Sequence, residues 1–434
     1  MAEPPTDAVS TFLRDDPEAL VEDALALLAL DTQNPPGETV GAVDWLEARL
    51  TQLGLSTERF AVDPAKPNLL ATLPAGDDSV SAAEDSTPVT DSPALCLLGH
   101  LDTVPYDAEA WSQDPLGERD GDRIYGRGAT DMKGQVASML ATARAFVETG
   151  EESPVTLRFA FVSDEEIGGH AGLPALLEAD RLAADACIIG EPTCERGRHS
   201  VTVADRGSIW LTLEATGEAA HGSRPMLGEN AIDRLYEGIS LLRERFGTMA
   251  LEVDPALEPI IEESVAYYRP RMGETAAREL FARPTINLGT IAGGEAINSV
   301  PQSARAEVDV RLTAGVPTDE ILAAIRECAA DCPGVTIADV SWSVGTAEPI
   351  DSPLVEAVSR TAEHVTGDRI YRRSATGGGD AKQLRNAGIS TVEFGLGTDT
   401  VHAVDEYTTV DALMGNALVY AGSVRAYGRR FGES

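Results

Sequence analysis

Three short blocks of the sequence combine histidine and acidic residues with glycines, at points where an apolar strand ends or a helix begins. They occupy residues 99–105, 125–134 and 163–169 and read Gly-His-Leu-Asp-Thr-Val-Pro, Tyr-Gly-Arg-Gly-Ala-Thr-Asp-Met-Lys-Gly and Ser-Asp-Glu-Glu-Ile-Gly-Gly. Imidazole nitrogens and carboxylate oxygens bind zinc and similar cations, and a carboxylate can also accept a proton. We therefore expect the blocks to build a hydrolytic site with two metal ions.

The first and third blocks predict different roles for their acids. His100 and Asp102 are two residues apart at the end of a strand, so both side chains can face the same way. A metal-binding histidine commonly donates its second N–H to a carboxylate, and Asp102 suits that role. Glu165 and Glu166 follow an apolar run, where burying both is costly without a cation or a proton. Because neighbouring side chains diverge, one can bind metal while the other moves a proton.

Three more residues are ligand candidates by their position. Asp131 precedes a helix, where it could cap the first turn, although its two oxygens could also bridge two cations. Glu191 follows the apolar run at 187–190, and His402 lies in a loop rich in glycine, threonine and aspartate at 397–402. A strand end or a rigid turn is where a ligand side chain is held in place.

Strands and helices alternate around these blocks. Apolar runs predict strands at 95–101, 155–162 and 184–190, and helical spacing predicts helices at 133–149 and about 171–180. This order favours an α/β layer with a mainly parallel sheet, in which ligands collect beyond the carboxyl ends of the strands. The acids and histidines named above stand at those ends.

A second pattern begins near residue 206. It predicts strand, helix, strand, strand, helix and strand at about 209–215, 229–246, 285–291, 304–312, 318–330 and 335–343, which is typical of a small α+β sandwich. Residues 248–284 form an extra, partly helical excursion, and the helical pattern returns at 354–366 and 410–427. We expect a catalytic domain at 1–205 and 348–434 with a domain inserted at 206–347.

Composition excludes some functions. The 434-residue chain carries 71 acids and 34 bases, a formal net charge of −37, which would repel nucleic acid and anionic membranes. We expect adaptation to high salt, where screening relieves self-repulsion. No apolar run reaches membrane-helix length, and the first residues lack a signal sequence, so a cytoplasmic protein with its five cysteines reduced is expected. Residues 75–94 predict an exposed acidic loop.

Together the blocks resemble the dinuclear zinc metallopeptidases that include acetylornithine deacetylase, succinyl-diaminopimelate desuccinylase, aminoacylase and glutamate-releasing carboxypeptidases. The motifs occur in the family's order over nearly the whole chain. The resemblance implies an α/β/α catalytic domain of the zinc-peptidase type with an inserted, ferredoxin-like lid and dimerisation domain. It also implies two divalent ions, zinc first, with cobalt or manganese as alternatives.

The resemblance further implies a role for each site residue. Asp131 would bridge the metals, with His100 and Glu191 completing one site and Glu166 and His402 the other. Glu165 would be the general base, Asp102 the partner of His100, and the bond from Asp131 to Met132 would be cis. In the lid, His221 would reach the partner subunit's active site in a homodimer, and Asn298 and Arg311 would grip the substrate carboxylate. The glycine loop with Gly378 and Gly379 would line the substrate pocket.

The leading function is hydrolysis of an N-acyl amino acid to a free amine and a carboxylate. Glu191 within Gly-Glu-Pro-Thr resembles the deacylases and carboxypeptidases, whereas many dipeptidases have aspartate there. A zinc carboxypeptidase or dipeptidase acting on small peptides is therefore the alternative enzyme. A non-catalytic binding relative would be expected to lack ligands, and all of them are present here.

Overall fold

The computed structural model describes residues 7–76 and 92–432. It divides into two compact units, of which the first comprises Met1–Val203, Glu348–Arg372 and Gly379–Ser434 and the second Ala204–Ala347 and Arg373–Gly378. The sequence assigned 373–378 to the part after the insertion. This segment packs with the second unit because the Ser374 carbonyl accepts a hydrogen bond from Tyr268 Oη at 3.1 Å and its N–H donates to Ser264 Oγ at 2.8 Å.

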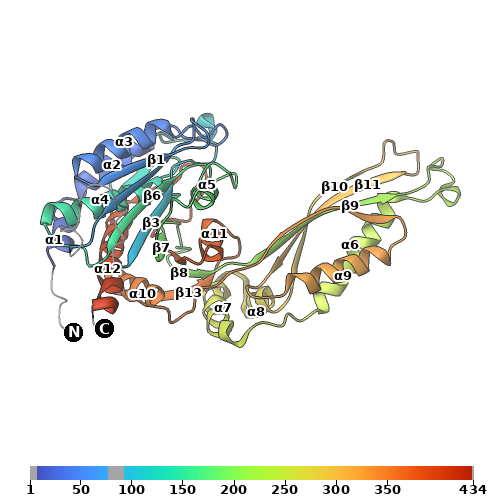
Figure 1. Ribbon diagram of the computed structural model, residues 1–434. Helices are drawn as coiled ribbons and strands as arrows, with labels where there is room; N and C mark the ends of the chain where they lie inside the picture. Colours follow the sequence, from blue (N-terminus) through green and yellow to red (C-terminus); the bar gives the residue numbers. More distant parts are fainter. Residues whose placement is uncertain (1–6, 77–91, 433–434) are drawn as a thin grey trace. The chain divides into compact units, whose positions relative to one another are not determined.

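The described part of the first unit is built on a mixed eight-stranded sheet (Figure 1). Its strands lie in the order β1 (Ser56–Phe60), β2 (Asn68–Leu73), β6 (Thr156–Val162), β3 (Ala94–His100), β7 (Ala186–Ile189), β14 (Ser390–Glu393), β8 (His199–Ala204) and β13 (Ile370–Ser374). The four central strands, β6, β3, β7 and β14, are parallel, whereas the pairs β1–β2, β2–β6 and β14–β8 are antiparallel. The carboxyl ends of the four parallel strands therefore meet at one edge.

Helices cover both faces of this sheet (Figure 1). One layer contains α1 (Ala8–Asp15), α2 (Pro17–Leu28), α4 (Lys133–Thr149), α10 (Pro353–Thr366) and α12 (Val410–Gly432), and α3 (Val40–Gln52) packs on β1 and β2. The other layer contains α5 (Leu173–Glu178) and α11 (Asp380–Asn386), which enclose an apolar cluster with Cys96, Leu98 and Ile189. The α/β/α architecture expected from the resemblance is confirmed.

The alternation of side chains along β3 explains this layering. Cys96 and Leu98 face α5 and α11, so Gly99, the residue after Leu98, faces the opposite side of the sheet, toward α4. A Cβ at Gly99 would lie 2.9 Å from Val136 Cγ2 and 3.0 Å from Met132 Cε. Glycine is therefore what lets the start of α4 approach the end of β3 closely.

Capping residues fix where several helices begin and end. Pro353 occupies the first turn of α10 and Ser352 Oγ accepts the N–H of Val355 at 3.3 Å, a combination that favours a helix start. The same helix ends at Gly367, whose φ of 72° is the left-handed conformation that glycine adopts at little cost.

The second unit, described throughout, is a four-stranded antiparallel sheet with helices on one face. Its elements are β9 (Gly207–Thr216), α6 (Ala231–Thr248), β10 (Thr285–Gly293), β11 (Ser303–Leu312), α9 (Thr318–Ala330) and β12 (Val335–Ser343). The strand order β10–β11–β9–β12 follows from the predicted succession of strands and helices. The excursion at 248–284 is helical, with α7 (Glu258–Met272) and α8 (Glu274–Ala282).

Some elements were not predicted from the sequence. They are α1, β1, β8, β13, α11 and a small sheet of β4 (Glu118–Asp120), β5 (Arg123–Tyr125) and β15 (Tyr407–Thr409). These elements are short or carry polar residues that hide the apolar period. The predicted acidic loop at 75–94 lies mostly outside the described residues.

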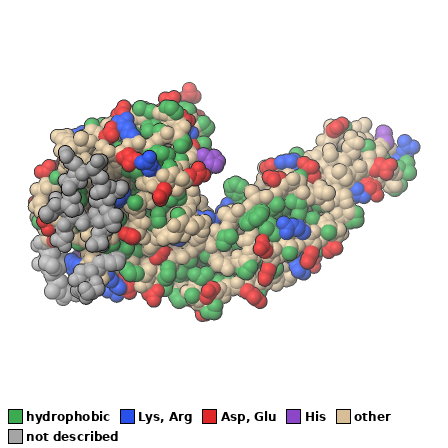
Figure 2. Space-filling model, viewed as in Figure 1, with side chains coloured by type: hydrophobic (Ala, Val, Ile, Leu, Met, Phe, Trp, Pro, Cys, Tyr) green, Lys and Arg blue, Asp and Glu red, His purple; other side chains and the backbone are tan. Residues whose placement is uncertain are grey.

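The surface is acidic over both units. Acidic side chains are spread over the visible face of each unit rather than gathered in one patch (Figure 2). Among the described residues, no helix combines the length and apolarity that a membrane span requires.

Candidate functional site

The candidate ligands of the first unit lie at the carboxyl ends of its parallel strands. His100 is the last residue of β3, Glu165 and Glu166 follow β6, Glu191 follows β7, and His402 lies between β14 and β15. Since β6, β3, β7 and β14 are neighbours in the sheet, the topology brings together residues up to 302 positions apart, from 100 to 402.

Asp131 lies between the two histidines. Its Oδ1 is 3.1 Å from His100 Nε2 and its Oδ2 is 3.2 Å from His402 Nε2. Each histidine nitrogen also lies near a second acid, His100 Nε2 at 3.5 Å from Glu191 Oε1 and His402 Nε2 at 3.3 Å from Glu166 Oε2. The geometry therefore gives two sets of nitrogen and oxygen atoms that share one carboxylate, which is an arrangement suited to two cations.

The backbone on either side of Asp131 agrees with this role. The peptide bond from Asp131 to Met132 is cis, as the resemblance implied. Helix α4 begins at Lys133 with Met132 at its N-cap and without a side-chain capping hydrogen bond. The alternative that Asp131 caps this helix is therefore wrong, because its two oxygens point to the histidines.

Burial and mutual repulsion raise the pKa of several acids of the site. Burial, reinforced by the charges of Glu166 and Asp131, raises the pKa of Glu165 to about 7. Burial and the charge of Asp131 raise the pKa of Glu191 well above its usual range. Burial and the charge of Glu165 likewise raise the pKa of Asp380, the first residue of α11, to about 8. These carboxyl groups retain protons unless positive charge is supplied.

The nearby acids also raise the pKa of both histidines of the site. Hydrogen bonds with Asp131 and Glu166 raise the pKa of His402 to about 10. Burial disfavours the charged form of His100, but its hydrogen bond with Asp131 and the nearby acids outweigh this effect and raise its pKa well above the ordinary value. The whole cluster thus attracts positive charge, and a bound cation would displace these protons.

Asp102 makes contacts that differ from the expected one. His100 Nδ1 lies 2.8 Å from the backbone oxygen of Asp102 and 3.8 Å from its carboxylate, so the carbonyl rather than the carboxylate orients the ring. A donating Nδ1–H leaves Nε2 free to act as a ligand. The Asp102 carboxylate instead accepts the backbone N–H groups of Glu165 and Glu166, each at 3.1 Å. Asp102 therefore holds the loop that carries both glutamates.

A buried ion pair that the sequence did not reveal supports Asp131 and His402. The Glu406 carboxylate accepts the N–H groups of Thr130 at 2.9 Å and Asp131 at 3.0 Å, and it pairs with the Arg127 guanidinium. Arg127 Nη2 donates to the backbone oxygen of His402 at 3.3 Å. The only sequence signal was the placing of Arg127 inside the Gly-Arg-Gly block, because Glu406 stands 279 positions later.

The glycine loop borders the same site. A Cβ at Gly379 would lie 3.4 Å from Glu165 Oε1, within van der Waals contact, so this glycine stands directly beside the glutamate. Gly378, its neighbour, is exposed and belongs to the second unit.

The candidate substrate residues of the second unit lie in two separate regions of it. His221 and Asn298 are neighbours, since Gly222 N–H donates to the Asn298 carbonyl at 2.7 Å. Arg311 lies near the end of β11, whereas Asn298 lies five residues before its start at Ser303. At about 3.4 Å per residue, the strand separates them by roughly 25–30 Å. One chain therefore does not bring Asn298 and Arg311 to the same carboxylate.

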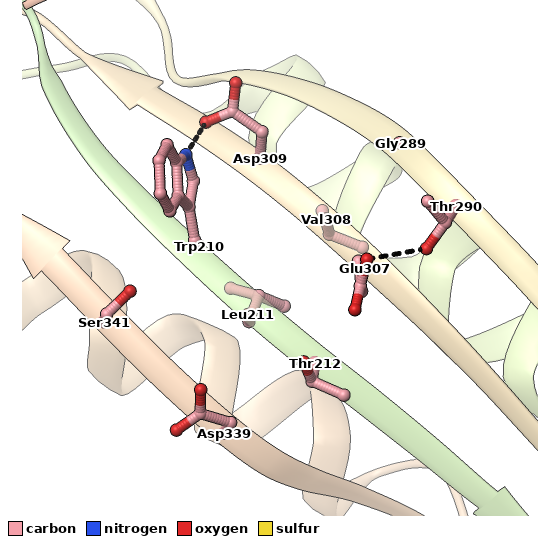
Figure 3. Close-up of a pocket in the computed structure, with 10 residues that line it drawn as sticks. All are labelled: Trp210, Leu211, Thr212, Gly289, Thr290, Glu307, Val308, Asp309, Asp339 and Ser341. Atoms are coloured by element: carbon pink, nitrogen blue, oxygen red, sulfur yellow. Dashed lines mark hydrogen bonds between the residues drawn. The ribbon is translucent and has the colours of Figure 1, made fainter. Parts of the chain in front are cut away.

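Arg311 points to the face of the sheet that lacks helices. Its Nε donates to Asp309 at 2.8 Å, and the same Asp309 oxygen accepts Trp210 Nε1 at 3.0 Å (Figure 3). These strands border a shallow hollow of about 440 Å³ that is also lined by Thr212, Thr290, Glu307 and Ser341. Arg311 is thus already paired with an acid in this unit.

Comparisons with known proteins agree with this geometry. The model of peptidase family M20/M25/M40 matches residues 96–426. A succinyl-diaminopimelate desuccinylase of Parvibaculum lavamentivorans is 30% identical over 406 residues, 89% of this chain and 90% of the relative.

Two solved structures share the fold. An M20 family metallo-carboxypeptidase from Sulfolobus solfataricus superposes with a TM-score of 0.75 at 19% identity, covering 95% of this chain and all of the other. A Bacillus subtilis protein described as a dinuclear metal binding peptidase of the M20 family gives a TM-score of 0.60 at 17% identity, covering 95% and 98% of the two chains.

We expect Glu406→Ala to lower the free energy of unfolding by about 3–5 kcal/mol, because it leaves the buried Arg127 guanidinium without a counter-charge. Zinc affinity should fall about 10–100-fold, since Asp131 loses a backbone contact. Urea unfolding of metal-free protein and zinc titration against a competing chelator would measure both effects.

Glu406→Gln is the matched control for this prediction. Its carbonyl oxygen can still accept the N–H groups of Thr130 and Asp131, so both losses should be smaller than in the alanine variant. Wild-type zinc affinity in Glu406→Ala would mean that this carboxylate does not hold Asp131 in place.

Proposed function

The chain belongs to peptidase family M20/M25/M40 and is a metal-dependent hydrolase, and we propose that it hydrolyses the amide bond of N-acyl amino acids. The observation that carries this proposal is the pair of ligand sets sharing Asp131, with Glu165 beside them. The acyl class is supported by the relative named succinyl-diaminopimelate desuccinylase, which matches over 89% of this chain. Succinylated and acetylated amino acids are accordingly the first substrates to test.

The residues present fit two divalent cations. His100, Glu191 and Asp131 would hold one, and Glu166, His402 and Asp131 the other. The donor set consists of imidazole nitrogens and carboxylate oxygens, which suits zinc first and cobalt or manganese as alternatives. When bound, such cations supply Lewis acidity to the substrate carbonyl and lower the pKa of water.

Glu165 would carry the proton in the reaction. Its carboxylate lies within 4.8 Å of ligand atoms of His100 and Glu191, so it can reach a water held between them. It would accept a proton as the water attacks the amide carbon and then donate it to the departing nitrogen. Asp102 would hold this glutamate in place through the backbone N–H at 3.1 Å.

We propose that the second unit acts as a lid and that two copies form a homodimer through it. The separation of His221 and Asn298 from Arg311 along β11 supports this arrangement, because residues from two chains could then complete one substrate site. Arg311 would exchange its bond with Asp309 for one with the substrate carboxylate.

The five free cysteines fit the reducing conditions of a cytoplasm.

We also propose that the protein works at high salt. Its 71 acids exceed its 34 bases by 37, so most acids have no basic partner to neutralise them. Its exposed ion pairs, such as Arg305 with Glu214 at 3.0 Å, are worth little and weaken in salt. Relief of repulsion among the excess acids should outweigh that loss.

A hydrolysis panel with free-amine detection tests the function. N-succinyl-diaminopimelate, N-acetylornithine, other N-acetyl amino acids and dipeptides would be compared after chelation and after addition of zinc or cobalt. We expect metal-dependent release from one acyl class. Turnover of dipeptides alone would replace the deacylase with a peptidase, and no turnover of any substrate would reject the proposal.

Glu165→Gln should retain both metals and lose at least about 100-fold in kcat, because the amide cannot accept the proton of the attacking water. Metal content by elemental analysis and steady-state kinetics would test this, with Asp380→Asn as the control for replacing a neighbouring buried carboxyl group by an amide. Near-normal turnover in Glu165→Gln would remove this residue from the proposed mechanism.

Thermal melts in KCl test the high-salt proposal. Raising KCl from about 0.1 M to about 1 M shortens the screening length from about 10 Å to about 3 Å, so Tm should rise. A non-ionic osmolyte at equal osmolality controls for exclusion effects. A Tm that is unchanged or falls in KCl would contradict the proposal.

A further inference from the structure

The segment Asn-Pro-Pro-Gly at 34–37 reads as a break between helices α2 and α3, yet it reaches the centre of the first unit. The Asn34 side chain is 1% exposed. Its Nδ2 donates one hydrogen bond to Asp102 Oδ2 at 2.9 Å and another to Asp164 Oδ1 at 3.0 Å. One amide group therefore joins two carboxylates that are 62 positions apart in the chain, at 102 and 164.

These two carboxylates enclose the pair of site glutamates. Asp102 accepts the backbone N–H groups of Glu165 and Glu166. Asp164 immediately precedes Glu165 and adopts a φ of 65°, a conformation that is strained for a residue with a Cβ and persists only where contacts enforce it. Asp164 also accepts the N–H of Ala171 at 3.3 Å and pairs with Lys66. The loop is thus fixed from both ends through one shared donor group.

The orientation of the amide follows from charge. Its two N–H groups face two carboxylates, and the reverse orientation would place the amide oxygen against both negative charges. In the adopted orientation Oδ1 is buried and has no hydrogen-bond partner among the described residues. A buried acceptor left unsatisfied is unfavourable, so the two bonds made by Nδ2 determine the placement of this side chain.

The surrounding backbone keeps Asn34 in position. Its N–H donates to the Thr103 carbonyl at 2.7 Å, beside the strand that ends at His100. Gly37 N–H donates to the Gln33 carbonyl at 2.7 Å and closes the turn. Gly37 has a φ of 75°, and a Cβ there would lie 2.7 Å from Asn34 Cγ. The final glycine of the segment therefore leaves the space that the Asn34 amide occupies.

We propose that Asn34 is a positioning residue that holds Glu165 and Glu166 at their working geometry by bridging Asp102 and Asp164. The proposal rests on the proposed function of Glu165 as proton carrier and Glu166 as ligand. Asn34 acts through the two aspartates. Loss of its amide leaves two facing carboxylates without a common donor, and the glutamate loop then departs from its position.

Asn34→Leu tests the proposal because leucine retains the volume and removes both donors. We expect kcat to fall about 10–100-fold, the usual range for residues that orient ligands, with KM nearly unchanged. Gln33→Ala is the matched control, because this neighbour lies in the same turn and its side chain bonds Asp31 and the Tyr106 N–H without touching either carboxylate. The control should keep wild-type kcat.

A second variant gives a signature that a general loss of structure would not produce. Asn34→Asp keeps the shape but faces Asp102 and Asp164 with a third carboxylate. Its kcat relative to wild type should be lowest at alkaline pH and recover as pH falls, because a protonated acid can donate to one of its neighbours. A ratio that does not depend on pH would contradict the bridging role.

Hydrogen exchange separates this inference from the proposed function. In Asn34→Leu, the amides of Glu165 and Glu166 should exchange faster than in wild type, whereas Gln33→Ala should not change them. This measurement needs no substrate, so it decides the role of Asn34 even if the wild type hydrolyses nothing in the panel. Unchanged exchange at both glutamates, or an equal kcat loss in Gln33→Ala, would overturn the proposal.

Discussion

The electrostatic cost of gathering carboxylates in one buried place governs this structure. Asp131, Glu165 and Glu191 meet at the edge of a sheet, where burial raises the pKa of both glutamates. Hydrogen-bond donors from distant parts of the chain offset part of the repulsion. Histidines contact Asp131, backbone N–H groups contact Asp102, and Arg127 pairs with Glu406. Positive charge supplied by cations would neutralise the remainder, and bound cations would then also stabilise the folded chain.

The sequence predicted the parts of the molecule that are local. Helical and strand spacing gave the main elements of both units, and the motifs gave the residues that the sheet brings together. The contacts that the sequence did not predict join residues that are far apart in the chain. Glu406 has no local feature that points to Arg127, and Asn34 looked like a chain break because its partners lie 68 and 130 positions away. The contact of Asp102 was also mistaken, since the backbone carbonyl is closer to His100 than the carboxylate is.

In the second unit, strand geometry determines which of the candidate substrate residues of one chain can act together. Asn298 and Arg311 were grouped by resemblance, and both belong to one continuous stretch that includes β11. An extended strand separates its ends by a distance that no small carboxylate spans. Arg311 is paired with Asp309, and His221 accepts a hydrogen bond from Ser223 N at 3.2 Å. A substrate carboxylate bound through Arg311 Nε would therefore replace Asp309.

The three lysines of the chain carry a practical consequence. Lys133 and Lys382 are buried, with Lys133 Nζ donating to the Leu30 carbonyl at 2.6 Å, and the Lys66 side chain is 14% exposed and paired with Asp164. Every other base is arginine. Acylating reagents, amine cross-linkers and resins that couple through lysine would find almost no reactive side-chain amine on the folded protein. The most accessible of the three, Lys66, pairs with Asp164, so forcing such a reaction would break an ion pair of the loop that carries Glu165 and Glu166.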